Sequence, residues 1–428
     1  MSNSEDRVVT RRAVLGGAAV GVAAVGLAPA WAAYAGNTST PAPLDQRTVD
    51  AVASRLDGGL IDLRRDIHQH PETAGQERRT AAVVARRLRS AGLDVTTGVG
   101  GYGVVGVLTG AHPGRTVAYR ADMDAVPPDE QIAGGPQPAH VCGHDVHTAV
   151  GVGVAEVLAR LRHRLTGTVQ FVFQPAEEAL AGAAAMLEAG VFARTRPAEI
   201  HALHCGPFPV GQFAVMPGFG LPGQDRGFIT LTGSQAAGSA PRLAAEIEAL
   251  GTVSPPATSA DLERLVADIQ IPDGPLAEFV FMRTGVTDAA AGAEIEVSYR
   301  CWPQSRYVEI RKEIHRLARS YGGAAVSFPN DPFPAMVCPE REGQAIKRYL
   351  QQAAGRDRVP TMYAAIPFSG EDFALFLNRI PGTFIFLGVR APGAAIETSY
   401  PHFGAFNPDE RAIGLGVRAM AGWLASRT

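Results

Sequence analysis

The order of helix-like and strand-like segments restricts the fold of this chain more than any other feature. From residue 47 to about 225, helix-like segments with apolar residues three or four positions apart, the first of them at 47–70, alternate with short β-rich segments such as 167–173 and 200–204. Alternation of this kind predicts an α/β domain with a central, largely parallel sheet flanked by helices. The same pattern returns from residue 333 to the end at residue 428.

The intervening residues, 226–332, have a different character. This region contains two strand-like segments and a helix-like segment, at 278–282, 294–300 and 308–321. They do not continue the regular alternation of helices and strands. A stretch rich in Gly, Ser, Ala and Pro at 233–241 is expected to be a loop before a helix at 242–250. These features predict a smaller α+β unit inserted into one catalytic domain, whose two parts are 47–225 and 333–428.

The first 35 residues have the pattern of an export signal. The pair Arg11-Arg12 precedes an apolar, Gly/Ala-rich stretch, and the small-residue pattern Ala30-Trp31-Ala32 follows. This order is typical of a twin-arginine signal peptide at residues 1–35. The alternative, an uncleaved anchor helix, is less favoured because the apolar stretch is shorter than the ~20 residues that span a bilayer. We therefore expect an extracellular, periplasmic or cell-envelope protein without a stable membrane anchor.

Charge and cysteine content exclude several classes of protein. The chain has 39 Lys and Arg against 42 Asp and Glu, for a net charge of −3, which gives no indication of nucleic-acid binding. Its four cysteines are too few for a disulfide scaffold. The sequence permits a disulfide between Cys301 and Cys338 but contains no pattern that predicts one.

The segment 140–147 carries the densest group of metal-binding side chains. It reads His-Val-Cys-Gly-His-Asp-Val-His. Gly143 allows a tight turn, so that Cys142 and His144 can converge on one point. Thiolate and imidazole are natural ligands of zinc and similar metals. This segment therefore predicts a metal site.

Further candidate ligands follow two apolar strand-like segments. Glu177 and Glu178 come directly after 167–173, where one carboxylate could bind a metal and the other could hold or move a proton. His204 is preferred over His201 because we place it at the end of its strand, on the opposite face. His402 lies in a loop before the last helix. A cysteine, histidines and carboxylates at loop positions of one α/β domain suit a two-metal hydrolytic site.

These motifs resemble the M20 metallopeptidase family, in particular its amidohydrolase branch of hippurate hydrolases, N-acyl-amino-acid deacylases and auxin-conjugate hydrolases. The matching stretches are 62–72, 120–127, 142–149, 173–178 and 370–373, together with His402. The resemblance implies two divalent metal ions, zinc or manganese, bound by five residues: Cys142, His144, Glu178, His204 and His402. It also implies a small N-acyl amino acid or similar amide as substrate, with the insert acting as a lid and as the interface of a homodimer.

The resemblance also implies roles for two carboxylates. Glu177 would be the general base that activates a metal-bound water and later protonates the leaving amine, and Asp124 would orient a metal ligand. One departure lies in the insert, where Ala237 stands at the position of a histidine that contacts the substrate of a neighbouring subunit. Arg300 matches the family pattern.

Three hypotheses therefore remain. The first is an exported metal-dependent amidohydrolase. The second is a metal-independent hydrolase with Cys142 as its nucleophile. The third is a metal-binding homologue whose turnover is weakened or lost, which the substitution by Ala237 favours and an intact Glu177 opposes.

Overall fold

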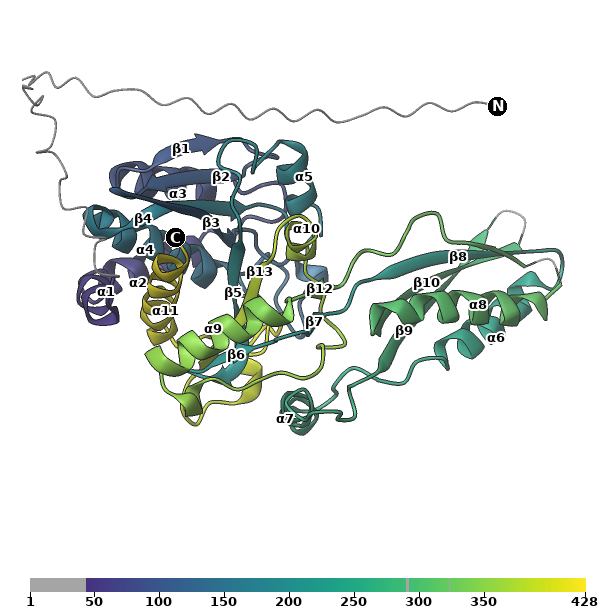
Figure 1. Ribbon diagram of the computed structural model, residues 1–428. Coiled ribbons are helices and arrows are strands. Elements are labelled where there is room, and N and C mark those ends of the chain that lie inside the picture. Colours follow the sequence, from purple (N-terminus) through teal and green to yellow (C-terminus); the bar gives the residue numbers. More distant parts are fainter. Residues whose placement is uncertain (1–43, 290–291, 323) are drawn as a thin grey trace, which may run out of the picture. The chain divides into compact units, whose positions relative to one another are not determined.

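The computed structural model describes residues 44–289, 292–322 and 324–428 (Figure 1). The predicted signal peptide, residues 1–35, lies outside this range. Among the described residues, no helix is both long enough and apolar enough to cross a membrane.

The main sheet has seven strands in the order β1-β2-β4-β3-β5-β13-β6. Its four inner strands pair in parallel, and β1, β2 and β6 pair antiparallel at the two edges. The sheet is thus mixed rather than largely parallel, because the short turn after β1 permits only antiparallel pairing with β2. The strands are β1 (Asp94–Thr97), β2 (Val104–Thr109), β3 (His112–Asp122), β4 (Thr166–Gln174), β5 (Ile200–Pro209), β6 (Phe213–Val215) and β13 (Gly382–Arg390).

One face of this sheet is covered by six helices: α1 (Gln46–Ala53), α2 (Asp57–His68), α3 (Arg78–Ser90), α4 (His144–Arg160), α9 (Glu340–Ala353) and α11 (Arg411–Arg427). α4 lies innermost, and every residue from His144 to Leu158 is buried. The middle of α4, residues 149–155, consists only of Ala, Val and Gly, and a helix segment that is apolar on all sides requires such a buried position. A Cβ at Gly153 would lie 2.6 Å from side-chain atoms of Leu60 and Val417, so α4 packs closely on α2 and α11.

The other face is covered by α5 (Gly182–Glu188), α7 (Ser259–Asp268) and α10 (Phe373–Leu377), around a core that includes Phe208, Phe376 and Phe384. α7 falls within the residues that we predicted as the insert, yet Leu262 and Leu265 belong to this core. The residue after α7, Ile269, also belongs to this core, and its carbonyl accepts a hydrogen bond from the Tyr363 amide at 2.7 Å.

A second sheet contains four antiparallel strands in the order β11-β8-β10-β9. They are β8 (Asp225–Thr232), β9 (Phe279–Ala289), β10 (Gly292–Trp302) and β11 (Ala325–Ser327), and α6 (Ala236–Glu248) and α8 (Tyr307–Arg319) pack on one face. The α/β domain with a central sheet, interrupted by a smaller α+β unit, is confirmed (Figure 1).

The two chain segments that connect the sheets are paired with each other. β7 (Gly220–Leu221) pairs with β12 (Met336–Val337). Gln224 and Phe333 add two backbone hydrogen bonds, at 3.2 and 2.8 Å. The second sheet therefore joins the first through a two-stranded connection. Short 3-10 turns complete the described structure: Pro128–Glu130, Arg162–Arg164, Gln304–Arg306, Arg356–Arg358 and Ile396–Thr398.

Three local expectations were wrong. The stretch 233–241 is not a loop throughout, because α6 begins at Ala236 and includes Pro241. Ala236 and Ala240 are good helix formers and are buried, and Pro241 removes only one hydrogen bond near the helix start. The expected helix at 47–70 is two helices, and β5 extends to Pro209 instead of ending near residue 204. The thiols of Cys301 and Cys338 are both free, so no disulfide joins them.

Candidate metal centre

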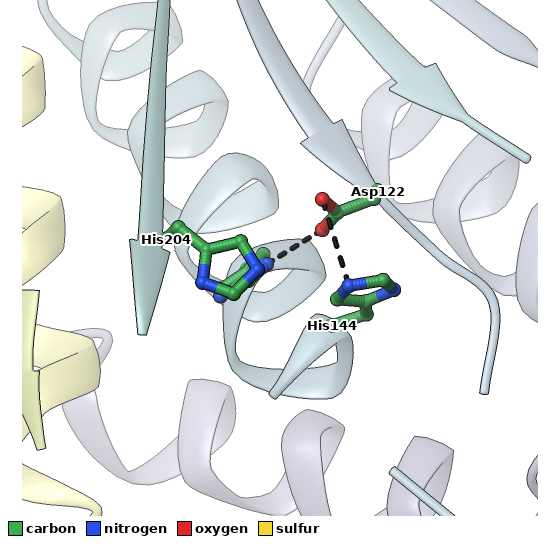
Figure 2. Close-up of side chains that lie close together, drawn as sticks. Asp122, His144 and His204 are labelled. Atoms are coloured by element: carbon green, nitrogen blue, oxygen red, sulfur yellow. Dashed lines mark hydrogen bonds and ion pairs between the residues drawn. The ribbon is translucent and has the colours of Figure 1, made fainter. Parts of the chain in front are cut away.

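Buried polar side chains from three elements converge beside the ends of the parallel strands. Asp122 is the last residue of β3, His144 is the first residue of α4, and His204 lies within β5 (Figure 2). β3 and β5 are parallel neighbours, so side chains near their carboxyl ends come together. The His144 Nε2 atom lies 3.8 Å from the Asp122 Oδ2 atom. His204 is therefore near the other candidates although its strand continues beyond it.

The five predicted metal ligands form two contacting groups. The Cys142 Sγ and His204 Nε2 atoms are 3.5 Å apart. Glu178 places Oε1 at 3.6 Å from His144 Nε2 and Oε2 at 3.2 Å from His402 Nε2. Ligand atoms of Cys142, His144 and Glu178 lie within 4.8 Å of one another, which connects the two groups. The structure brings these side chains together, and their role as ligands stays a prediction.

The donor set and its unpaired atoms fit a metal site. His144 Nε2 and Glu178 Oε1 are buried and have no hydrogen-bond partner among the described residues. Leaving such a group unpaired costs about 1–3 kcal/mol, so native structures normally satisfy it. Imidazole nitrogen, thiolate sulfur and carboxylate oxygen are together the ligands of zinc and related divalent metals. A bound cation would satisfy both atoms.

Gly143 makes the turn that joins the first two candidate ligands. It precedes α4 with φ of 91°, in the left-handed region that glycine adopts without strain. A Cβ there would lie 2.7 Å from the Cys205 Sγ atom. The turn predicted from the Cys-Gly-His sequence is present, and β5 packs directly against it.

Replacing this glycine is expected to disturb both stability and metal binding. The left-handed backbone costs a residue with a Cβ about 1–2 kcal/mol, and Gly143→Ala adds a clash with Cys205. Gly101→Ala is a matched control, because Gly101 has φ of 95° but no atom within 4 Å of the added Cβ. Denaturant unfolding and metal content would be measured for both variants. Equal losses in the two would show that the contact with Cys205 is unimportant.

Asp124 lies between two of the candidate ligands. Its Oδ1 atom is 3.3 Å from His144 Nδ1, and its Oδ2 atom accepts a hydrogen bond from the Glu178 amide at 2.9 Å. The carboxylate is fully buried. One side chain thus restrains the ring of His144 and the backbone of Glu178. This position suits the orienting role that the family resemblance implies for Asp124.

Sequence reasoning did not include Asp122 and His147 among the site residues. His147 Nδ1 contacts Asp122 Oδ1 at 2.6 Å, and its Nε2 accepts from the Cys205 amide at 2.7 Å. Both ring nitrogens of His147 are therefore occupied, and it supports Asp122. Burial tends to raise the pKa of Asp122, but Arg120, His144 and His147 outweigh it and hold that pKa well below its usual value. The position of Asp122 two residues before Asp124 could have identified it.

Glu177 also lies close to two other buried acidic residues, Glu371 and Asp372. Arg120 is buried and contacts Asp122, Glu371 at 2.8 Å and Asp372 at 3.3 Å. Burial, with Glu371 and Glu178 nearby, raises the pKa of Glu177 well above its usual value. The acidic pair at 371–372 is a recognisable motif, but its contact with Arg120 depends on the fold.

The centre opens into a cavity of about 1010 Å³. Glu177, His204 and His402 line its side on the α/β domain. Side chains of the second sheet line the facing side, among them Phe281, Arg283 and Arg300. The cavity is large enough for a small organic molecule to lie between the candidate metal centre and these residues.

A mixed sheet with a buried donor set beside the ends of its parallel strands is an arrangement that suits an α/β metallohydrolase. Residues 118–426 match the model of the peptidase family M20/M25/M40. The chain therefore belongs to that family, and it is a hydrolase acting on amide bonds. The resemblance drawn from the sequence motifs is confirmed.

Related proteins cover most of the chain. It is 30% identical over 392 residues to thermostable carboxypeptidase 1 of Saccharolobus solfataricus, covering 86% of this chain and 94% of the relative. It is 31% identical over 375 residues to N-acetylcysteine deacetylase of Bacillus subtilis, covering 85% and 95%. The YxeP protein of Bacillus subtilis, a dinuclear metal-binding M20 peptidase, has 28% identity and a TM-score of 0.66, with 87% and 98% covered.

Proposed function

We propose that this protein hydrolyses the amide bond of an N-acyl amino acid or a similar small amide or dipeptide. The observation that carries the proposal is the pair of unpaired buried atoms, His144 Nε2 and Glu178 Oε1, next to a cavity that Glu177, Glu178 and Arg300 line. Relatives named N-acetylcysteine deacetylase and N-acetyldiaminopimelate deacetylase support this substrate class.

Two divalent ions, zinc or manganese, are the cofactors of this proposal. Their ligands would be Cys142, His144, Glu178, His204 and His402. Such a pair of ions, when bound, polarises a scissile carbonyl and lowers the pKa of a water molecule. The dinuclear site of YxeP supports two ions rather than one.

Glu177 is the general base of this mechanism. Its carboxylate accepts a proton from the attacking water and returns it to the nitrogen of the leaving amine. Glu177 Oε2 lies 3.9 Å from His144 Nε2, so the carboxylate is beside the candidate metal centre. Burial, with Glu371 and Glu178 nearby, raises the pKa of Glu177, which makes its carboxylate a stronger base than an ordinary glutamate.

Arg300 is the group that binds the carboxylate of the amino acid. Its Nη1 atom is buried without a hydrogen-bond partner among the described residues, and Nη2 is 3.3 Å from the side-chain oxygen of Gln224. Burial lowers the pKa of Arg300 to about 10, with Glu177 opposing and Arg283 adding to the shift. The guanidinium remains charged at neutral pH and pairs well with a carboxylate.

Metal removal tests this function. We expect purified protein to contain bound divalent metal, to cleave members of a panel of N-acyl amino acids, and to lose at least about 10²-fold in rate after complete chelation. Re-addition of zinc or manganese should restore the rate. Full activity after all metal has been removed, measured by elemental analysis, would contradict the proposal.

A catalytically weakened homologue is the second candidate. Ala237 replaces the lid histidine of the family, and it is exposed in the first turn of α6. Wild-type protein that binds two metals but cleaves nothing in a broad panel would favour this candidate. A rate gain of more than about tenfold in Ala237→His would indicate a lost substrate contact, since one oxyanion donor contributes 10²–10³.

We also propose that the protein is exported by the twin-arginine route. The support is the sequence of residues 1–35, with its paired Arg11 and Arg12. Replacing both arginines by lysine should retain the protein inside the cell, as judged by fractionation. Unchanged export would contradict this route.

A homodimer formed through the insert completes the proposal. β9 pairs only with β10 within the described sheet, and residues 285–289 along it are exposed. A free strand edge of this kind can pair with a second copy. Light scattering of the purified protein would give the mass, and a monomer at micromolar concentration would exclude a stable dimer.

A further inference from the structure

Two arginines lie together on the cavity face of the second sheet. In the register of β9 and β10, Phe281 is opposite Arg300 and Arg283 is opposite Ser298. All four side chains point to the same face, because alternate residues of a strand do so. Diagonal neighbours in such a pair of strands are about 7–8 Å apart, within reach of long side chains. Arg283 and Arg300 thus face the same part of the cavity.

Arg300 is held in place by neutral groups. Gln224 accepts from Arg300 Nη2, and the Gln224 side-chain amide donates to Ser298 Oγ at 2.9 Å. Its other terminal nitrogen, Nη1, is buried and unpaired among the described residues. Burial lowers the pKa of Arg300 to about 10, Glu177 opposes this shift, and the nearby charge of Arg283 adds to it. No protein carboxylate forms an ion pair with Arg300 in the described structure.

Arg283 is positioned by an aromatic ring rather than by an acid. Its guanidinium carbon lies 5.1 Å from the centroid of the Phe281 ring. The Phe281 ring packs edge-to-face against the ring of Phe368 in the α/β domain, with 4.9 Å between the two ring centroids. Within the part of the chain that the structure describes, Arg283 forms no ion pair, whereas Arg226 in the same row binds Glu296 at 2.9 Å. Two adjacent cations repel each other, and an anion bound between them reduces this repulsion.

We propose that Arg283 is a second carboxylate anchor, and that the preferred substrates are N-acyl amino acids with an acidic side chain. This inference rests on the proposed function, in which Arg300 binds the α-carboxylate. A substrate with two carboxylates then contacts both guanidinium groups. Arg283 is exposed, and its contact with the Phe281 ring partly restricts it before the substrate binds.

The test compares substrates that differ in one charge. For wild-type protein we expect kcat/KM to be about tenfold or more higher for N-acetylglutamate than for N-acetylglutamine, as a charge-assisted hydrogen bond predicts. Arg283→Gln should remove this preference, so that kcat/KM becomes about equal for the two substrates. Arg242→Gln, in α6 and outside the cavity lining, is the matched control and should keep the preference.

A binding measurement separates this inference from the proposed function. Calorimetry with N-acetylglutamate and N-acetylglutamine gives the two dissociation constants if the protein does not cleave them, and the KM values take their place if it does. Preferential binding of N-acetylglutamate that disappears in Arg283→Gln supports the inference even when no hydrolysis occurs. Equal binding of the two ligands by wild type, or a preference that survives Arg283→Gln, would overturn it. If the protein then hydrolysed only N-acyl amino acids with uncharged side chains, the proposed function would still stand.

Discussion

Glu177→Gln is expected to lower kcat by about 10³-fold, within the range for loss of a general base. Glutamine has nearly the shape of glutamate but cannot accept the proton of the attacking water. Glu178, the next residue, is the one whose oxygens face His144 and His402. The variant should therefore keep its metal while losing turnover. Initial rates on an N-acyl amino acid, together with elemental analysis of the same sample, measure both quantities.

Glu188→Gln provides the control for Glu177→Gln, because Glu188 is an exposed carboxylate at the end of α5. Its activity should equal that of wild type. A Glu177→Gln enzyme with more than a tenth of wild-type kcat would remove Glu177 from the proposed role. Loss of metal in the same variant would instead assign this carboxylate to the metal centre.

Cys142→Ser is expected to weaken metal binding by more than about 10²-fold, because removal of even a supporting residue costs 10–100-fold. A serine hydroxyl is a poorer ligand than a thiolate. Excess zinc or manganese should restore a substantial part of the activity. Titration with a competing chelator measures the affinity, and rates at increasing metal concentration measure the recovery.

The same variant distinguishes the metalloenzyme from a hydrolase with a cysteine nucleophile. Burial, with Glu178 and Glu177 nearby, raises the pKa of the Cys142 thiol well above its usual value, so the free thiol is a weak nucleophile. Metal binding must displace this proton, and affinity should therefore rise with pH. A Cys142→Ser protein that stays inactive at every metal concentration, together with a wild type that resists chelation, would favour the nucleophile.

Local sequence patterns were sufficient to predict most of the side chains that the structure brings together at the candidate metal centre. Cys142, His144, Glu177 and Glu178 lie within short motifs next to strand-like segments, and their spacing indicates their chemistry. The sheet then brings these motifs together, because consecutive parallel strands end at the same edge. The architecture could be predicted for the same reason, since helix and strand periodicities are local properties.

Contacts between distant segments could not be predicted in this way. Arg120 and Glu371 are 251 positions apart, and neither has a pattern that identifies the other as its partner. The start of α6 was missed because Gly, Ser and Pro favour loops, whereas burial of Ala236 and Ala240 against the second sheet favours a helix. The diagonal placement of Arg283 and Arg300 depends on strand register, which only the folded sheet defines.

The place of β5 has a consequence for how the protein is synthesised. β5 lies between β3 and β13, but β13 leaves the ribosome only after residues 210–381 have been translated. Until then one edge of β5 has no partner, and its residues Ile200–Phe208, which are buried in the finished fold, are open to other chains. His402 is translated later still. A chain that stops before β13 can neither close the sheet nor present all five candidate ligands, so truncated products should aggregate without acquiring the complete centre.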